Sequence, residues 1–314
     1  MENLLFSFNA TIPIFLLMIL GMLFRKLGWI DETFAAKMNQ FVFLVPLPVL
    51  VFEDLATVDF SEVWNMKFVL FCFGVTFLSI AIVSAISFLW KEKSIQGEFI
   101  QASYRSSAAL LGIAFIQNIY GNSGLAPLMI IGSVPLYNIM AVVVLSFFAP
   151  KRKKLDWNVW KKTVKGIVTN PIIIGIVIGL LWSAFRIPMP TIMAKTVSSV
   201  GAVATPLGLM ALGASFDIKK IKGKVAPTVV ATAMKLVGFV AIFLPIAIGM
   251  GFRQEELVAI LVMLGSATTV SCYVMSKNMG HEGVVTSAVV MLTTVLSAFT
   301  LTGWLYLLRS FGLV

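Results

Sequence analysis

Charge is the scarcest property of this sequence. Only 12% of its 314 residues are Asp, Glu, Lys or Arg, whereas a typical soluble domain carries about 25% charged residues. Hydrophobic residues make up 59% of the chain, and its mean hydropathy is +0.97. A chain of this length with so few charges cannot cover its surface in water, so we predict an integral membrane protein.

Histidine and cysteine are almost absent as well. The lone His281 falls in a predicted loop, which excludes a histidine-based metal site or catalytic triad. Cys72 and Cys272 lie in apolar segments and are predicted to be small buried hydrophobic residues rather than a disulfide. The carboxylates fall in loops or at the ends of apolar segments, so an intramembrane enzyme would lack its paired acids. We expect no enzymatic activity, no metal and no cofactor.

Long apolar runs, by contrast, are abundant. A spanning helix needs about 20 mostly apolar residues. No basic stretch precedes the first run, so we expect a spanning helix there rather than a removable signal peptide. The ten predicted spans are residues 6–25, 34–53, 67–90, 98–119, 124–148, 163–185, 190–214, 225–250, 254–277 and 283–309. Pro, Gly or polar residues interrupt the second, fourth, seventh and ninth.

The distribution of positive charge predicts the orientation in the membrane. Most of the 24 Lys and Arg residues fall in loops on one side of the predicted spans, with seven of them between Lys151 and Lys165. Cytoplasmic loops carry such an excess, so both termini are predicted to lie outside the plasma membrane. The basic run at 151–154 is therefore interpreted as a cytoplasmic linker, and we expect no nucleic-acid partner.

A pattern of residues recurs along the chain at an offset of 158 residues. It links Pro13 with Pro171, Gly21 with Gly179, Pro48 with Pro206, and Glu98 with Glu256. We therefore predict two repeats of five helices, residues 1–150 and 163–314, joined by the linker 151–162. An odd number of spans inverts the second repeat relative to the first. The predicted fold is an all-α integral membrane protein with ten transmembrane helices in two inverted repeats.

Polar clusters occupy equivalent positions in the fourth and ninth spans. A helix that breaks inside the bilayer must line a polar cavity, and the freed N-terminus of a half-helix attracts anions. Close packing through small residues is the alternative explanation, but recurrence in both repeats favours a central substrate site. The predicted substrate-binding hydroxyls are Ser106, Ser107, Ser266, Thr268, Thr269 and Ser271. Helix breaks are predicted at Pro46, Pro48, Gly112, Pro206, Gly208 and Gly265.

Two cations lie within predicted spans, where a charge costs at least about 2.5–3.5 kcal/mol. Arg105 is either the counter-charge for an anionic substrate, since a guanidinium grips a carboxylate with two hydrogen bonds, or a side chain that reaches the interface. Lys235 has no charged equivalent in the first repeat, where Phe77 stands. It either replaces a coupling ion or bridges carbonyl groups of a broken helix.

Several motifs together resemble the auxin efflux carrier family of permeases, bacterial branch. They are NQFVF at 39–43, PVL at 48–50, YRS at 104–106 before Gly112, GSATTVSCY at 265–273 and KNMG at 277–280. The resemblance implies ten helices in two inverted repeats, with helices 4 and 9 broken and crossing at the centre. It also implies a scaffold of helices 1, 2, 6 and 7 beside a moving transport unit. Ser107 and Ala267 depart from the Asn and Pro common in the family.

The resemblance implies transport of small carboxylates such as malate or malonate, since bacterial members are transporters of this kind. We therefore predict a secondary transporter of small organic anions that works by alternating access in the lipid bilayer. Proton coupling, sodium coupling and a homodimer remain open. The alternatives are a sodium-coupled symporter of the bile-acid-transporter type, which the absence of a carboxylate at the crossing disfavours, and a channel or ligand-sensing membrane protein.

Overall fold

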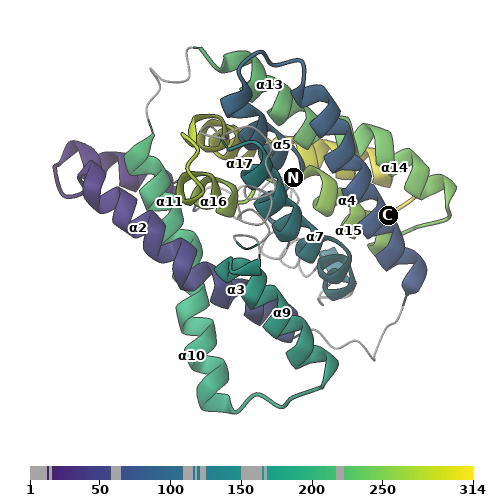
Figure 1. Cartoon of the computed structure of the whole chain (residues 1–314). Coiled ribbons are helices and arrows are strands. Elements are labelled where there is room, and N and C mark those ends of the chain that lie inside the picture. Colours follow the sequence, from purple (N-terminus) through teal and green to yellow (C-terminus); the bar gives the residue numbers. More distant parts are fainter. Residues whose placement is uncertain are drawn as a thin grey trace.

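The computed structural model describes residues 13, 16–57, 65–108, 116, 119–120, 125–149, 165, 168–216 and 223–314, and the regular structure within them is helical (Figure 1). The helices of the first half of the chain are α2 (Glu32–Leu44), α3 (Pro46–Ala56), α4 (Met66–Ser87), η1 (Lys93–Ile95), α5 (Gln96–Tyr104) and α7 (Ala126–Phe147). Those of the second half are α9 (Pro171–Ala184), α10 (Thr191–Ala202), α11 (Ala204–Ser215), α13 (Val225–Ala233), η3 (Met234–Gly238), α14 (Phe239–Gly249), α15 (Glu255–Gly265), α16 (Ser271–Asn278) and α17 (Val284–Ser310).

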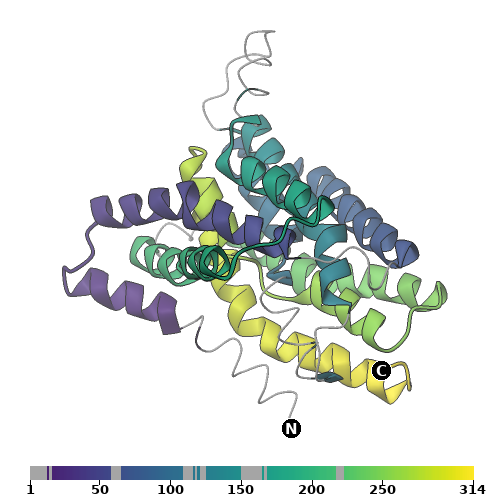
Figure 2. The same ribbon diagram turned by 90° about the horizontal axis from the view of Figure 1, so that it is seen from below.

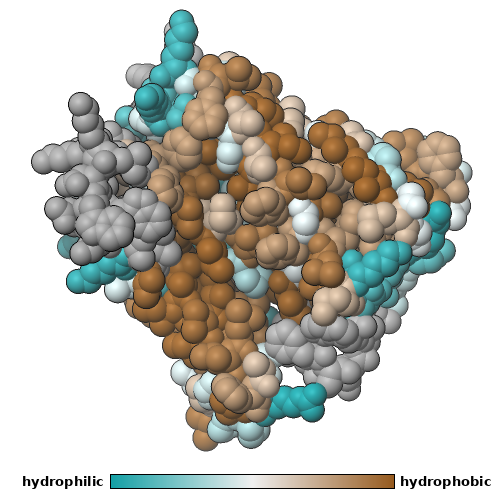
Figure 3. Space-filling view, turned by 45° about the vertical axis from the view of Figure 1, so that its right-hand side comes forward, coloured by the Kyte–Doolittle hydropathy of each residue, from teal (hydrophilic) through white to brown (hydrophobic). Residues whose placement is uncertain are grey.

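Six helical stretches among the described residues are long and apolar enough to cross a membrane. They are Glu32–Ala56, Met66–Ser87, Leu128–Phe147, Thr191–Ser215, Val225–Gly249 and Val284–Ser310, and Pro171–Ala184 is a shorter apolar helix. Apolar side chains also cover much of the outer surface (Figure 3). The protein is therefore an all-α membrane protein, as predicted. Part of the second half of the span predicted at 98–119 lies outside the described residues, as does the start of the span at 6–25.

The helices form two groups that lie side by side. One group contains α2, α3, α9, α10 and α11, in which α3 packs on α9 and α10 while α2 packs on α11 (Figures 1 and 2). The other contains α4, α5, α7 and α13–α17, in which α4 packs on α5 and α7. Helix α16 also contacts α2 and α11, so it joins the two groups. The site described below lies where they meet.

Two long helices are interrupted at equivalent positions. Val45 separates α2 from α3, and Val203 separates α10 from α11; the two valines differ by the same 158 residues as the sequence repeat. Pro46 opens α3 at its first position, where the missing N–H costs no hydrogen bond. The remaining prolines of this set, Pro48 and Pro206, follow within the first turn of α3 and α11, where proline is tolerated.

Gly208 was predicted to break a helix, but it lies within α11 after the interruption at Val203. A Cβ atom at Gly208 would stand 3.4 Å from side-chain atoms of Val270 and Val274. The absence of a side chain here gives α11 close contact with α16, which is the physical reason for a glycine. Gly265 ends α15 and so does mark a break, whereas Gly112 lies outside the described residues.

Each half of the chain supplies a carboxylate that caps a helix of the other half. Glu98 at the start of α5 accepts hydrogen bonds from the backbone N–H groups of Gly283 (2.7 Å) and Val285 (2.9 Å), at the start of α17. Glu255 at the start of α15 accepts one from the N–H of Leu125 (2.7 Å), just before α7. A carboxylate at a helix N-terminus satisfies free N–H groups and opposes the helix dipole. These contacts tie the two halves together reciprocally.

Glycine permits close packing of helices within the first group. A Cβ atom on Gly179 of α9 would stand 2.9 Å from the carbonyl oxygen of Phe52 in α3. At the equivalent place 158 residues earlier, a Cβ atom on Gly21 would overlap the backbone of Met210 in α11. The two contacts are therefore related by the same offset as the repeat.

We expect Gly179→Ala to destabilise the protein by about 1–3 kcal/mol, because the new methyl group forces the α3–α9 contact apart. The matched control is Gly74→Ala in α4, where a Cβ atom meets nothing within 4 Å. That substitution should stabilise its helix by up to about 1 kcal/mol. Thermal unfolding of the purified proteins in detergent measures both changes, and equal unfolding temperatures for the two variants would contradict the close packing.

Candidate functional site

Two non-helical segments meet in the interior. Helix α5 ends at Tyr104, and Arg105 is extended, with φ −72° and ψ 133°. Helix α15 ends at Gly265, and Ser266 is extended, with φ −72° and ψ 163°; α16 begins at Ser271. The N–H of Ser107 donates to the carbonyl of Ala267 at 2.9 Å. The segments 105–107 and 266–269 therefore lie against each other, and we refer to them together as the crossing.

Side chains satisfy the backbone groups that the crossing frees. The Thr268 hydroxyl donates to the carbonyl of Ala102 (2.9 Å). The backbone N–H of Thr268 donates to Oγ1 of Thr293 (3.0 Å). The Ser106 hydroxyl donates to the carbonyl of Met263. Because hydrocarbon offers no partner to such groups, these hydroxyls hold the broken backbone in place.

The ammonium group of Lys235 lies at the C-terminal end of α15. Its side chain is fully buried, and its ammonium group donates to the Leu264 carbonyl (2.5 Å) and to the Ser106 hydroxyl. The π-helical segment η3 carries Lys235, and the indole N–H of Trp304 donates to the nearby carbonyl of Leu236 (3.2 Å). A helix C-terminus carries partial negative charge, so the ammonium group both bridges carbonyl groups and neutralises this end of α15.

Arg105 is the only basic residue among the described lining residues of the main cavity. Its side chain is 2% exposed and therefore does not reach the interface. The guanidinium donates to Oδ1 of Asn138 (2.7 Å), the Ser271 hydroxyl (2.8 Å) and the Met275 sulfur (2.8 Å). The ion pairs found between described residues do not include it. The three partners that orient the guanidinium are neutral, so none of them offsets its positive charge.

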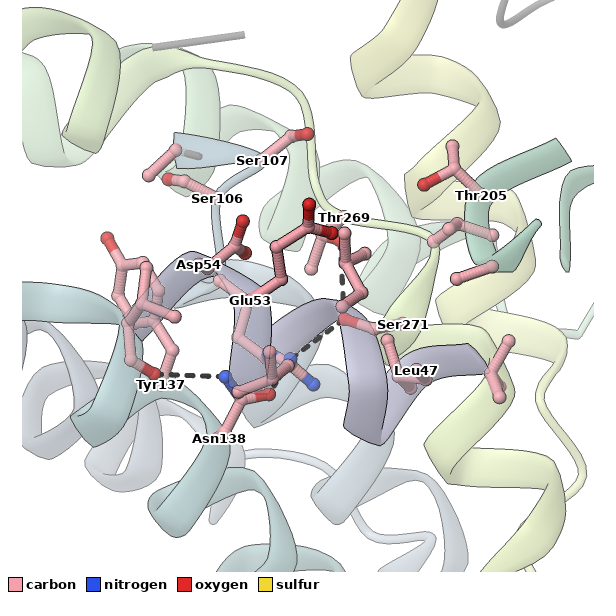
Figure 4. A pocket seen from close by; sticks show the side chains of 18 of the residues that line it. Leu47, Glu53, Asp54, Ser106, Ser107, Tyr137, Asn138, Thr205, Thr269 and Ser271 are labelled. Carbon is pink, nitrogen blue, oxygen red and sulfur yellow. Dashed lines mark hydrogen bonds between the residues drawn. The ribbon is translucent and has the colours of Figure 1, made fainter. Parts of the chain in front are cut away.

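The cavity has a volume of about 500 Å³ and lies between the two helix groups. Figure 4 shows Ser106, Ser107 and Thr269 of the crossing and Ser271 of α16 around the space that α3 and α7 enclose from the other sides. Its polar and charged lining residues are Glu53, Asp54, Thr57, Arg105, Ser106, Ser107, Tyr137, Asn138, Thr205, Thr269 and Ser271. A cation, two carboxyl groups, hydroxyls and one amide group around a space of this size suit a small polar ligand.

The structure divides the residues predicted to bind substrate. Five of the seven line the cavity: Arg105, Ser106, Ser107, Thr269 and Ser271. Ser266 and Thr268 do not line it; both are buried, and Thr268 holds the crossing together instead. The Ser266 hydroxyl has no hydrogen-bond partner among the described residues.

Sequence reasoning missed six polar residues of the cavity, of which Thr57 follows α3 and Thr205 lies in α11. Tyr137 and Asn138 come from α7, and Glu53 and Asp54 from α3. The only signal in the sequence was the presence of polar residues within or at the end of apolar segments. Within the described part of the chain, no cluster of three or more His, Cys, Asp or Glu side chains could hold a metal ion.

Interrupted helices that meet beside a polar cavity inside an all-α membrane protein define the class of secondary membrane transporters. A family model described as "Membrane transport protein" matches residues 6–305. The chain therefore belongs to this family, that of the auxin efflux carriers, whose members are transporters and not enzymes.

Relatives of the chain carry the names of transporters. It is 24% identical to a "Putative malonate transporter" of Rhizobium meliloti (strain 1021), over 96% of each chain. It is 19% identical to an "Uncharacterized transporter" of Methanothermobacter thermautotrophicus, over 95% of this chain and 97% of the other. Among solved structures, the sodium proton antiporter MjNhaP1 from Methanocaldococcus jannaschii shares the fold, with a TM-score of 0.66, 12% identity, and coverage of 95% of this chain and 97% of that one.

We expect Lys235→Met to lower the free energy of unfolding by about 2 kcal/mol, because it leaves the buried Leu264 carbonyl without its charged donor. Lys195→Met is the matched control, since Lys195 is exposed on α10 and its loss should change stability by less than about 0.5 kcal/mol. Detergent thermal unfolding of both variants measures the difference. A Lys235→Met protein as stable as the control would show that the ammonium group does not hold the crossing.

Proposed function

We propose that the protein carries small organic anions, such as malonate, malate or another carboxylate, across the plasma membrane by alternating access. Arg105 is the observation that carries this proposal: a buried guanidinium on the cavity wall whose partners are all neutral. A carboxylate is the ligand that a guanidinium binds best, through two parallel hydrogen bonds. The hydroxyls of Ser107 and Thr269 also line the cavity and would donate hydrogen bonds to the other oxygens of the bound anion.

The name of one relative agrees with a carboxylate as the substrate. The name of the Rhizobium meliloti relative contains malonate, a small dicarboxylate that the cavity of about 500 Å³ can hold with several water molecules. A dicarboxylate offers one carboxyl group to Arg105 and the second to the hydroxyls of the crossing. Ser106 contributes less directly, because its hydroxyl is already engaged with Lys235 and Met263.

The proposed architecture is ten transmembrane helices in two inverted repeats, residues 1–150 and 163–314, with 151–162 as a cytoplasmic linker. The reciprocal caps by Glu98 and Glu255 support it, and so do the matching interruptions at Val45 and Val203. Helix α4 corresponds in this scheme to α13, η3 and α14, and α7 to α17. The helix containing α5 and that formed by α15 and α16 are the broken helices that cross.

A second polar cavity supports alternating access. It has a volume of about 360 Å³ and is lined by residues of α2, α11, α16 and the loop before α17, among them Asn39, Ser215 and Lys277. The main cavity adjoins the N-terminal end of α16, and this second one its C-terminal end. Beside the second cavity, the Asn278 side chain donates to the Asn39 carbonyl (3.2 Å) and so joins α16 to α2. Each cavity would serve one side of the membrane.

The position of Lys235 indicates whether transport requires a coupling cation. The ammonium group already supplies positive charge to the carbonyl end of α15, where a bound cation could otherwise sit. This placement favours a carrier that does not require sodium over a sodium-coupled symporter. Replacing sodium by potassium in the transport assay separates the two, since a sodium-coupled symporter would lose uptake.

Counterflow in proteoliposomes tests the function. Vesicles loaded with unlabelled malonate, malate or lactate should accumulate the same labelled anion, and excess external anion should block it. Arg105→Gln should reduce this counterflow about 100-fold, because about 3 kcal/mol of charge-assisted hydrogen bonding to substrate is lost. Arg309→Gln removes an exposed arginine of α17 and should leave it unchanged. Undiminished counterflow by Arg105→Gln would refute the site, and flux without saturation or counterflow would indicate a channel.

The proposed orientation is tested by labelling single cysteines. Both native cysteines are buried, so a membrane-impermeant maleimide should leave them unmodified. Ser310→Cys, at the end of α17, should react in intact cells because the C-terminus lies outside. Gly223→Cys, in the loop before α13, should react only after permeabilisation because that loop lies inside. The opposite pattern would reverse the topology.

A further inference from the structure

Two acidic side chains share the cavity with Arg105. Glu53 and Asp54 of α3 both line it, and both are partly exposed rather than free in solvent. In Figure 4 their carboxyl groups rise from α3 toward the side of the cavity that carries Ser106, Ser107 and Thr269. They therefore face the same space as the hydroxyls proposed to bind the substrate.

Neither carboxylate forms an ion pair with a cation of the described residues. The ion pairs found between described residues involve neither Glu53 nor Asp54. Arg105 is the only basic residue among the described lining residues, so the ionised acids leave the lining with one negative charge in excess. Lys235 does not line the cavity, and its ammonium group donates to Ser106 and to the Leu264 carbonyl. An organic anion that enters would raise this excess to at least two charges in a partly enclosed cavity, where like charges repel more strongly than in bulk water.

The elements packed around α3 offer few other titratable groups. Helices α9 and α11 contain none, and α7 contributes only Tyr137. Lys195 of α10 lines a separate groove with Phe41 and Pro46. Glu32 and Lys37 of α2 lie on the other side of the Val45 interruption, and Asp59 and Glu62 lie outside the described residues. The excess negative charge is therefore relieved at the acids themselves.

We propose that Glu53 and Asp54 form a proton site that links anion binding to proton uptake. This inference rests on the proposed function. When the anion binds, one proton from solvent joins a carboxylate oxygen of the pair, because two neighbouring carboxylates beside a third negative charge cannot all stay ionised. The proton leaves when the anion leaves. Anion affinity therefore rises as pH falls.

The experiment measures binding of lactate and tartrate to the purified protein at about pH 6 and about pH 8, where their own carboxyl groups stay ionised. The apparent Kd of the native protein should be at least about tenfold lower at the acid pH, since one linked proton changes it by up to tenfold per pH unit. The double variant Glu53→Gln/Asp54→Asn should bind with the same Kd at both. Glu92→Gln, which removes an exposed carboxylate outside the cavity, should keep the native pH dependence.

A direct measurement needs no variant. Addition of lactate to the native protein in weak buffer should remove about one proton per bound anion from solution, as reported by a pH indicator dye. A Kd that does not change with pH, or binding without proton uptake, would overturn the proton site while leaving the anion carrier intact. Failure of lactate, tartrate and malonate to bind at either pH would instead refute the proposed function.

One competing role for the acids is distinguished by an isosteric ligand. Alanine carries an ammonium group where lactate carries a hydroxyl. If the acids are a proton site, alanine binds no better than lactate. If alanine binds more tightly than lactate and the double variant reverses that order, Glu53 and Asp54 pair with a cationic group of the substrate, and the proton site is overturned.

Discussion

Every feature of this protein's interior depends on backbone groups that the membrane cannot satisfy. At the crossing, two segments of the chain leave the helical hydrogen-bond ladder within an apolar surrounding, and each freed N–H or carbonyl needs a partner. The bond between Ser107 and Ala267 supplies one, and threonine hydroxyls and the Lys235 ammonium group supply others. The polar character of the site follows from this requirement, because the groups that stabilise broken helices are also suited to bind a polar solute.

The division of labour between the two buried cations follows from their neighbours. Lys235 is surrounded by carbonyl oxygens and a hydroxyl, which use its ammonium donors within the protein. Arg105 has an amide, a hydroxyl and a thioether for partners, and its Nε has none among the described residues. An arginine has five donors in a fixed plane, so some remain for a ligand even when others are engaged. One cation therefore supports the crossing, and the other faces the cavity.

Sequence spacing predicted much of the framework. The offset of 158 residues paired Pro48 with Pro206 and Gly21 with Gly179. In the structure the prolines follow the interruptions at Val45 and Val203, and the two glycines pack on α11 and α3, because equivalent positions in a repeat have equivalent neighbours. The offset also located the crossing, since hydroxyl clusters recur only where backbone needs them. The contribution of α3 and α7 to the cavity could not be predicted, because which side chains of a helix face inward depends on how far it rotates against its neighbours. For the same reason Gly208 was mistaken for a break, although it is a contact.

The reciprocal caps described above have a consequence for biosynthesis. Glu98 lies in the first half of the chain, but the N–H groups that hold it belong to α17, the last helix among the described residues. The segment 105–107 likewise obtains its hydrogen bond only when residues 266–269 have been made, and Thr268 obtains its own only when Thr293 has been made. During synthesis, the first half of the chain therefore enters the membrane before the N–H groups that bind the Glu98 carboxylate exist, and with only Asn138 of the three partners of Arg105 in place. The ribosome must complete nearly the whole chain before the centre of the molecule can order, so assembly of the site is a late step of membrane insertion.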